Sequence, residues 1–157
     1  MKRRTFIKTT GLGTVTVCTC GLGMNSCSMF SGISDTPVAP EESIMFSDNQ
    51  VTLNLTLIPE LKNSGGSVKF EVKQDVENPL KFLVINTGNN GLMVYENRCT
   101  HGAREIEYRS DDGILQCVSF GHSKYNLDGQ VTGGPAPSPI RKFTVNHTDD
   151  KLIINLG

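Results

Sequence analysis

At 157 residues and 37% hydrophobic composition, the chain can bury the core of one ordinary domain and carry some additional segments. Its formal charge is −1, but the first 27 residues hold four basic residues and no acidic one. The remaining 11 basic and 16 acidic residues therefore carry a net charge of −5. An acidic body of this kind argues against nucleic acid as a partner.

Residues 1–27 have the features of an export signal. The run KRRTFIK at residues 2–8 resembles the twin-arginine motif, with Lys2 where Ser or Thr is usual. A weakly apolar segment rich in Gly and Thr follows as far as Gly23, too short and too polar for a comfortable membrane-spanning helix. An ordinary signal peptide with a basic start is the alternative.

Three of the five cysteines lie within this segment. Cys18 and Cys20 are expected to leave with the signal. Cys27 follows Met24-Asn25-Ser26, which resembles a lipoprotein signal-peptidase site with Met in the position where Leu is favoured. The expectation is a lipid-modified Cys27 that anchors the chain to a membrane, and the alternatives are cleavage elsewhere or an uncleaved signal anchor.

Residues 28–47 are rich in Ser, Gly, Pro and Glu and show no apolar periodicity. Such composition is typical of a flexible linker, so we expect a tether here and a folded domain over residues 48–157.

From residue 51 onward, apolar residues alternate with polar ones in short segments, which predicts strands and no convincing helix. The expected strands cover residues 51–57, 68–72, 80–85, 92–95, 105–108, 114–118, 141–145 and 152–156. Asn89-Asn90-Gly91 and Asp112-Gly113 are hairpin signals, and residues 147–150 are expected to form the last turn. The sequence predicts an all-β fold of small antiparallel sheets.

Cys99 and His101 precede a second pair, Cys117 and His122, across a short insert that contains the Asp112-Gly113 turn. Thiolates and imidazoles are ligands for iron–sulfur centres and for zinc, and four of them complete a set. Because a Cys and a His two residues apart cannot share one face of a helix, we expect each pair on a loop at the tip of a hairpin. We interpret the two loops as closing on one metal centre.

These residues resemble the pattern of the Rieske iron–sulfur family, which is Cys-x-His followed after some fifteen to twenty residues by Cys-x-x-His-Gly-Ser. Asp128-Gly129 and the segment Gly134-Pro135-Ala136-Pro137-Ser138-Pro139 are similar to the family's proline loop. The similarity covers roughly residues 48–157. It implies a Rieske-like all-β fold with two cluster-binding hairpin loops and a [2Fe-2S] cofactor.

The second loop departs from this pattern by one residue. Phe120 stands where the family has its histidine, and His122 comes two positions later, directly before Ser123. Gly121 gives the loop the backbone freedom to bring His122 to the second iron. The alternatives are an ordinary loop histidine on a cluster-free domain and a mononuclear zinc site, although structural zinc sites usually space their ligands differently.

The resemblance assigns a role to each site residue. Cys99 and Cys117 would bind the inner iron, and His101 and His122 the outer one. Ser123 and Tyr125 keep the Ser-x-Tyr spacing that in high-potential members donates hydrogen bonds to cluster sulfurs and so raises the potential. The alternative for both is purely structural. The disulfide that locks the two loops in some members of the family is not possible here, because Arg104 and Ser119 take its places.

Three functions follow as hypotheses. The first is a one-electron carrier of the bacterial cell envelope, and the second is an electron-transfer subunit of a larger oxidoreductase such as a quinol-linked complex. The third is a cluster-free binding or structural lipoprotein on a Rieske-like scaffold. No acid–base pair or nucleophile–base set appears, so an electron-transfer protein is expected rather than a stand-alone enzyme. The expected place is the periplasmic side, with a membrane anchor, and the acidic body is compatible with docking to a basic patch on a redox partner.

Overall fold

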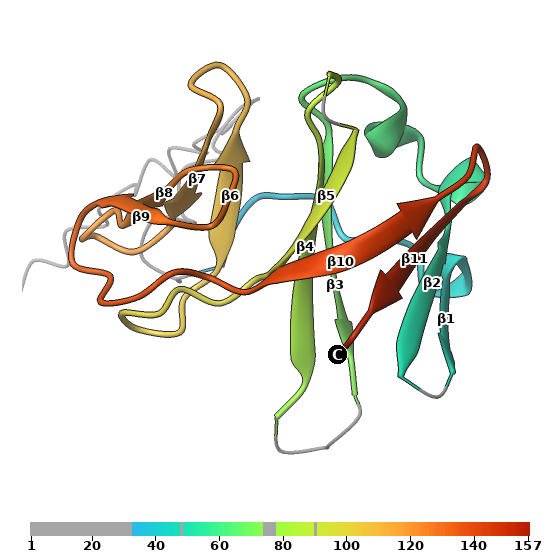
Figure 1. Cartoon of the computed structure of the whole chain (residues 1–157), viewed down its shortest axis with the longest axis horizontal. Coiled ribbons are helices and arrows are strands. Elements are labelled where there is room, and N and C mark those ends of the chain that lie inside the picture. The colour runs from blue at the N-terminus through green and yellow to red at the C-terminus, as the bar shows by residue number, and fades with distance from the viewer. Residues whose placement is uncertain (1–32, 48, 74–77, 90) are drawn as a thin grey trace, which may run out of the picture.

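The computed structural model describes residues 33–47, 49–73, 78–89 and 91–157. These residues form two antiparallel sheets that lie side by side (Figure 1), with three short 3-10 helices and no α-helix among them. The all-β prediction is therefore confirmed. The strands are β1 (Ile44–Ser47), β2 (Gln50–Asn54), β3 (Ser67–Val72), β4 (Leu80–Asn86), β5 (Leu92–Glu96), β6 (Ile106–Arg109), β7 (Ile114–Cys117), β8 (Lys124–Tyr125), β9 (Val131–Gly133), β10 (Lys142–His147) and β11 (Lys151–Asn155).

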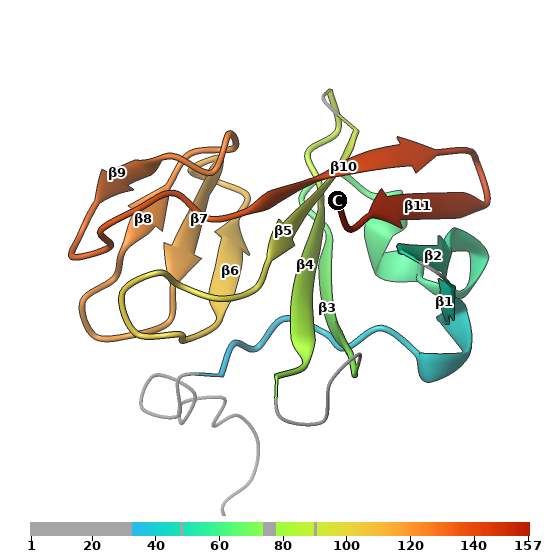
Figure 2. The same ribbon diagram turned by 60° about the horizontal axis from the view of Figure 1, so that its bottom comes forward.

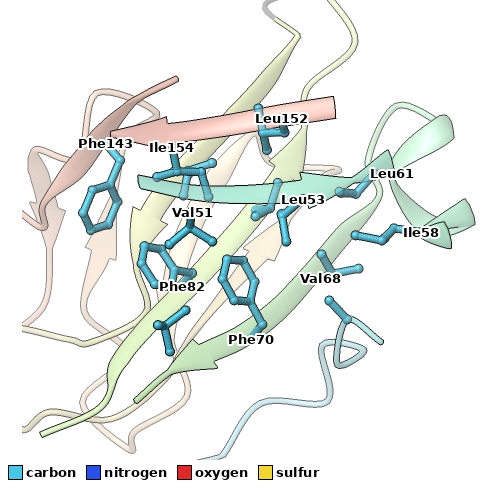
Figure 3. Packing of buried hydrophobic residues seen from close by; sticks show 14 of the residues in the cluster. Val51, Leu53, Ile58, Leu61, Val68, Phe70, Phe82, Phe143, Leu152 and Ile154 are labelled. Carbon is cyan, nitrogen blue, oxygen red and sulfur yellow. The ribbon is translucent and has the colours of Figure 1, made fainter. Parts of the chain in front are cut away.

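The larger sheet has the order β1-β2-β11-β10-β5-β4-β3 and is antiparallel throughout. The alternating apolar residues predicted from the sequence point to its inner face and form the main core (Figure 3). Phe82 lies at the centre of an aromatic group, stacked on Phe70 at 4.7 Å between ring centroids and tilted against Phe143 at 5.1 Å. The second sheet packs against residues of β4 and β5 in this larger sheet.

The smaller sheet has the order β6-β7-β8-β9 and carries the second core, which includes both cysteines. β4 and β5 contribute to both cores, because alternate residues of a strand point to opposite faces. Phe82 and Val84 face the main core, whereas Leu83 and Ile85 belong to the second one. This double burial explains why the segment reads as a continuous apolar run rather than as an alternation.

The predicted strands are present with ends shifted by one or two residues, apart from the one over residues 51–57. β2 stops at Asn54, and helix η2 (Leu55–Leu57) follows, with helix η3 (Pro59–Lys62) after it. The Asn54 side chain accepts a hydrogen bond from the Thr56 backbone N–H at 3.1 Å and so caps the turn. The prediction of an extended chain to Leu57 was wrong because this local cap replaces the strand ladder. Strands β1, β8 and β9 were not predicted.

The expected tether is not free where the structure describes it, from residue 33 onward. Residues 33–39 run from the smaller sheet to the edge of the larger one (Figure 2), where Val38 pairs with Lys69 of β3. Helix η1 (Glu41–Ser43) and β1 follow, and β1 pairs with β2. Composition alone did not reveal this because the segment is held by its backbone and by polar contacts rather than by an apolar stripe.

The predicted export signal, the three cysteines within it and the first residues of the tether lie outside the described residues. In the part of the chain that the structure describes, no helix has the length and apolar character needed to cross a membrane.

Candidate metal centre

The first ligand loop connects β5 to β6 and carries Cys99 and His101. It closes on itself, because the Cys99 N–H donates to the Arg104 carbonyl at 2.8 Å and the Ala103 N–H donates to the Cys99 carbonyl at 2.9 Å. Ala103 takes a left-handed backbone conformation at φ 54°. The turn buries the Cys99 thiol and leaves His101 exposed.

The second ligand loop connects β7 to β8 and contains the additional residue. Cys117 and Ser123 stay paired across its base, with the Cys117 N–H donating to the Ser123 carbonyl at 2.8 Å. Between them a turn closes from the His122 N–H to the Ser119 carbonyl at 2.9 Å, and His122 has φ 43°. The turn absorbs the extra length by projecting Phe120 outward, where its side chain is 95% exposed. The pairing of β7 with β8 is therefore kept on both sides of the additional residue.

The proline loop packs against both ligand loops. Gly134 lies so close to the second loop that a Cβ there would come within 2.6 Å of Ser123 Cα, and its φ is 81°. A Cβ on Gly121 would likewise come within 2.8 Å of Pro135 Cγ. On the other side, the Thr100 hydroxyl donates to the Ser138 carbonyl at 2.7 Å. Three segments distant in sequence thus meet at one end of the domain.

The two thiols lie together, buried and unbonded. Burial raises the pKa of Cys117, and an ionised Cys99 raises it further. Burial also acts to raise the pKa of Cys99, but hydrogen bonds from Tyr125, from the His101 backbone and from Cys117 outweigh it and lower the pKa. The Tyr125 hydroxyl lies 3.3 Å from Cys99 Sγ, and burial together with this contact raises the pKa of Tyr125 to about 12. The pocket therefore favours one thiolate at Cys99.

Ser123 lies at the base of the second loop, where its backbone pairs with Cys117. Its hydroxyl is fully buried, and it is the buried side-chain oxygen in the described residues that lacks a hydrogen-bond partner. It is near enough to Cys99 to help lower the pKa of that thiol, although no bond of acceptable geometry forms. A buried hydroxyl left without a partner is costly unless another group accepts from it. Sulfide of a bound cluster would be such an acceptor, so this residue fits the group.

The imidazoles are placed differently from the thiols. His101 and His122 are both exposed, and His122 Nδ1 faces Gln116 Nε2 at 3.0 Å. Within the described residues, no three His, Cys, Asp or Glu side chains are close enough to share one metal ion. A mononuclear zinc site needs all of its donors around a single ion. A two-iron centre instead divides its donors, with two thiolates on one iron and two imidazoles on the other.

The structure adds supporting residues that the sequence analysis missed. The Thr100 Oγ1 lies 3.3 Å from the Tyr125 hydroxyl, in addition to its bond with the proline loop. Asn97 is buried before the first loop, and its Oδ1 accepts from the Ile106 N–H at 2.7 Å. Ser119 Oγ accepts from Cys117 Sγ at 3.2 Å. No spacing in the sequence distinguishes these residues from ordinary loop polar residues.

Two small antiparallel sheets, with paired cysteines on loops that meet under a proline segment, define a metal-binding β-domain. The family model of the Rieske [2Fe-2S] domain matches residues 58–144, more than half of the chain. The chain belongs to the Rieske [2Fe-2S] domain family. This confirms the [2Fe-2S] cofactor expected from the sequence.

Relatives by sequence include the cytochrome b6-f complex iron-sulfur subunit of Chlorobaculum tepidum, 28% identical over 77 residues, which are 49% of this chain and 41% of that protein. The cytochrome b6-f complex iron-sulfur subunit 1 of Synechocystis sp. is 31% identical over 77 residues, 49% of this chain and 43% of that protein. The matched parts span less than half of these relatives. Among solved structures, the ferredoxin of carbazole 1,9a-dioxygenase from Nocardioides aromaticivorans IC177 has the same fold, with a TM-score of 0.50 and 15% identity over 60% of this chain and 88% of that one.

Proposed function

We propose that this protein transfers single electrons through its [2Fe-2S] cluster, as a carrier of the cell envelope or as the electron-transfer subunit of an oxidoreductase. The buried, unpartnered Ser123 hydroxyl beside the two thiols is the observation that carries this proposal. The family match and the relatives named as cytochrome b6-f iron-sulfur subunits support it.

In this proposal Cys99 and Cys117 bind one iron and His101 and His122 bind the other. When bound, the cluster accepts and releases one electron, and its histidine ligation raises the potential above that of all-cysteine clusters. Other residues of the chain surround these ligands. Tyr125 donates toward Cys99 sulfur, Ser123 offers a second donor, and the proline loop excludes water from the buried side. Hydrogen bonds to sulfur stabilise the charge added on reduction.

The remaining assignments concern the N-terminus. We propose that residues 1–27 direct twin-arginine export, a route that accepts folded cargo and therefore suits a cofactor inserted before transport. Cys27 then becomes a lipid-bearing N-terminus, which holds the domain on the periplasmic side of a membrane. Replacement of Arg3 and Arg4 together by Lys should leave the precursor in the cytoplasm, and Cys27→Ala should release the exported protein from membranes.

The decisive measurement is an electron paramagnetic resonance spectrum of the reduced protein with iron and sulfide analysis. Mixed His and Cys ligation predicts a lower average g value than all-cysteine ligation, with two irons and two acid-labile sulfides per chain. A colourless, iron-free protein of normal stability would instead support a cluster-free binding or structural lipoprotein.

A further inference from the structure

Phe120 is the most exposed large hydrophobic side chain in the described part of the molecule, at 95%. It belongs to the turn that contains the additional residue, two positions before His122. A phenylalanine held fully in water forgoes the hydrophobic stabilisation that burial would bring. The turn nevertheless directs it away from both cores and presents it next to the metal centre.

Charge is distributed unevenly around this residue. The three segments that meet at the site, residues 97–104, 117–125 and 133–141, contain Arg98, Arg104, Lys124 and Arg141 and no Asp or Glu. The other residues from 28 to 157 contain seven basic and sixteen acidic residues. We call these three segments together the cluster end. It is locally basic, whereas the rest of the chain after residue 27 is acidic. An uneven charge distribution of this kind orients a molecule during diffusional encounter.

A hollow beside the first ligand loop shows where an anionic group would fit. It is lined by Arg98, Arg141 and Glu96 together with residues 99–103 and Pro139, so two positive charges face one carboxylate there. Arg141 is held in place because its guanidinium donates to the Leu156 carbonyl and lies over the Phe143 ring, 4.6 Å from the centroid. Its charge is thus kept at the site by contacts with uncharged groups.

We propose that the cluster end is a docking surface for a redox protein whose own contact face is an apolar recess with a carboxylate rim. Phe120 inserts into the recess as the aromatic anchor, and Arg98 and Lys124 pair with the rim. This rests on the proposed electron-transfer function, and it reverses the expectation of a basic partner that the net charge suggests. Aromatic residues within a charged rim are typical of protein interfaces, and complementary charge mainly raises the association rate.

The test is a stopped-flow comparison of two oxidants of opposite surface charge. The reduced holoprotein is mixed with an acidic or with a basic c-type cytochrome over a range of ionic strength. We expect the acidic cytochrome to be reduced about tenfold faster at low salt, with the difference vanishing at high salt. Faster reduction of the basic cytochrome at every ionic strength would overturn the proposal, because net charge would then control docking.

Variants separate the parts of the surface. Arg98→Glu with Lys124→Glu should remove the preference for the acidic cytochrome, whereas Lys62→Glu with Lys151→Glu changes the net charge equally and should keep it. Phe120→Ala should slow reduction of the acidic cytochrome several-fold, and Phe46→Ala, at another exposed phenylalanine, should not. Equal rates for Phe120→Ala and the unaltered protein would show that this side chain is no anchor.

A second readout does not depend on the cluster. The chain contains no tryptophan, so Phe120→Trp introduces a single tryptophan at this position, whose emission can be excited apart from that of the three tyrosines. The ratio of iodide to caesium quenching should be about twofold higher in Phe120→Trp than in Phe46→Trp at low salt. A blue shift on addition of anionic lipid vesicles would overturn the proposal in favour of a membrane surface. Loss of the iron signal with the quenching ratio intact would contradict the electron-transfer function and not the surface charge.

Discussion

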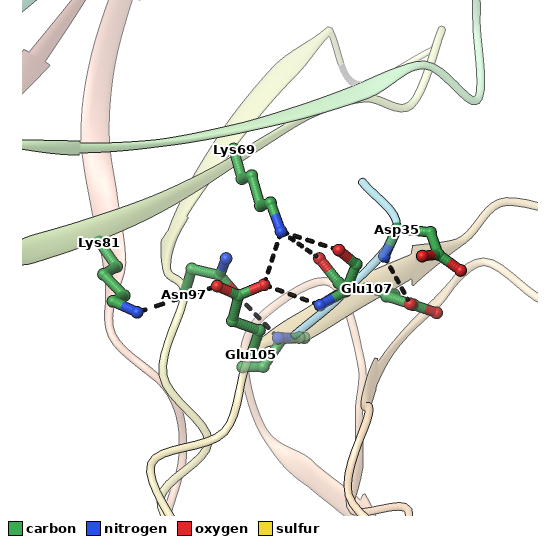
Figure 4. A network of polar contacts seen from close by, with 8 residues as sticks. Asp35, Lys69, Lys81, Asn97, Glu105 and Glu107 are labelled. Carbon is green, nitrogen blue, oxygen red and sulfur yellow. Dashed lines mark hydrogen bonds and ion pairs between the residues drawn. The ribbon is translucent and has the colours of Figure 1, made fainter. Parts of the chain in front are cut away.

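The Lys69 ammonium lies 2.8 Å from the Glu105 carboxylate and joins β3 of the larger sheet to the segment that enters β6 (Figure 4). The same carboxylate accepts from the Ser34 N–H at 2.8 Å and lies 3.8 Å from Lys81. The backbone carbonyl of Glu105 accepts from the N–H of Val118, the residue directly after Cys117, at 3.1 Å. Glu105 therefore connects residues 33–39, the larger sheet and both ligand loops.

Replacement of Glu105 should destabilise the domain more than a surface substitution does. Its side chain is 11% exposed, and Glu105→Gln would leave Lys69 with a neutral partner in a largely buried setting. We expect a loss of about 1–3 kcal/mol in the free energy of unfolding, measured by urea denaturation. Glu60→Gln, at an exposed position of η3, is the matched control and should change stability by less than about 0.5 kcal/mol.

The contribution of Glu105 should depend on pH. Burial acts to raise its pKa, but hydrogen bonds from Lys69 and Ser34 outweigh burial and hold the pKa below the usual 4.5. The unfolded chain therefore takes up this proton at a higher pH than the folded chain, while Lys69 and Lys81 stay charged. The stabilisation is fully present above about pH 4.5 and is lost as the pH falls through the folded-state pKa. Unfolding midpoints of the unaltered protein and Glu105→Gln should converge as the pH falls through the folded-state pKa of Glu105; a difference that stays constant with pH would contradict this.

His122→Ala tests the second imidazole. If the residue binds iron, the variant should lose the cluster spectrum and about one cluster's iron per chain. His147→Ala removes an exposed histidine from the end of β10 and should leave the spectrum unchanged. An unaltered spectrum in His122→Ala would show that the turn around Phe120 holds this ring away from the metal.

Tyr125→Phe removes the hydroxyl that lies 3.3 Å from Cys99 Sγ. A hydrogen bond that stabilises the reduced state by about 0.5–1.5 kcal/mol corresponds to roughly 20–60 mV for one electron, so the midpoint potential should fall by that amount. Protein-film voltammetry provides the measurement. Tyr108→Phe, on β6, should leave the potential in place, and a fall of equal size there would point to a general packing effect.

Gly134→Ala should loosen the proline loop. The added methyl would lie 2.6 Å from Ser123 Cα, and the backbone has φ 81°, a region that side chains rarely adopt. We expect faster loss of the cluster absorbance on chelator challenge and a stability loss of about 1–3 kcal/mol. Gly102→Ala, on the first loop, meets nothing within 4 Å and is the control. Equal cluster lifetimes in both variants would show that the close packing at Gly134 has no protective effect.

Local chemistry was enough to predict much of this protein. Period-two alternation predicts strands because successive side chains point to opposite faces, and the Asp112-Gly113 turn predicts the hairpin between β6 and β7. The spacing of Cys99, His101 and Cys117, with the proline segment beyond, likewise indicated the family. Each of these features depends on residues that are close together in the sequence, and so it can be recognised from the sequence alone.

Tertiary structure decided what depends on distant contacts. The sequence shows that the second loop has an additional residue, but only the fold shows that the turn sends Phe120 outward while Cys117 and Ser123 stay paired. The sequence predicted a linker over residues 28–47. Part of this segment is instead fixed by contacts among Ser34, Lys69 and Glu105, which are separated by up to 71 residues and so form no local pattern. A buried polar contact between remote segments leaves no periodic pattern, since its free energy depends on burial and on partners that the folded chain alone brings together.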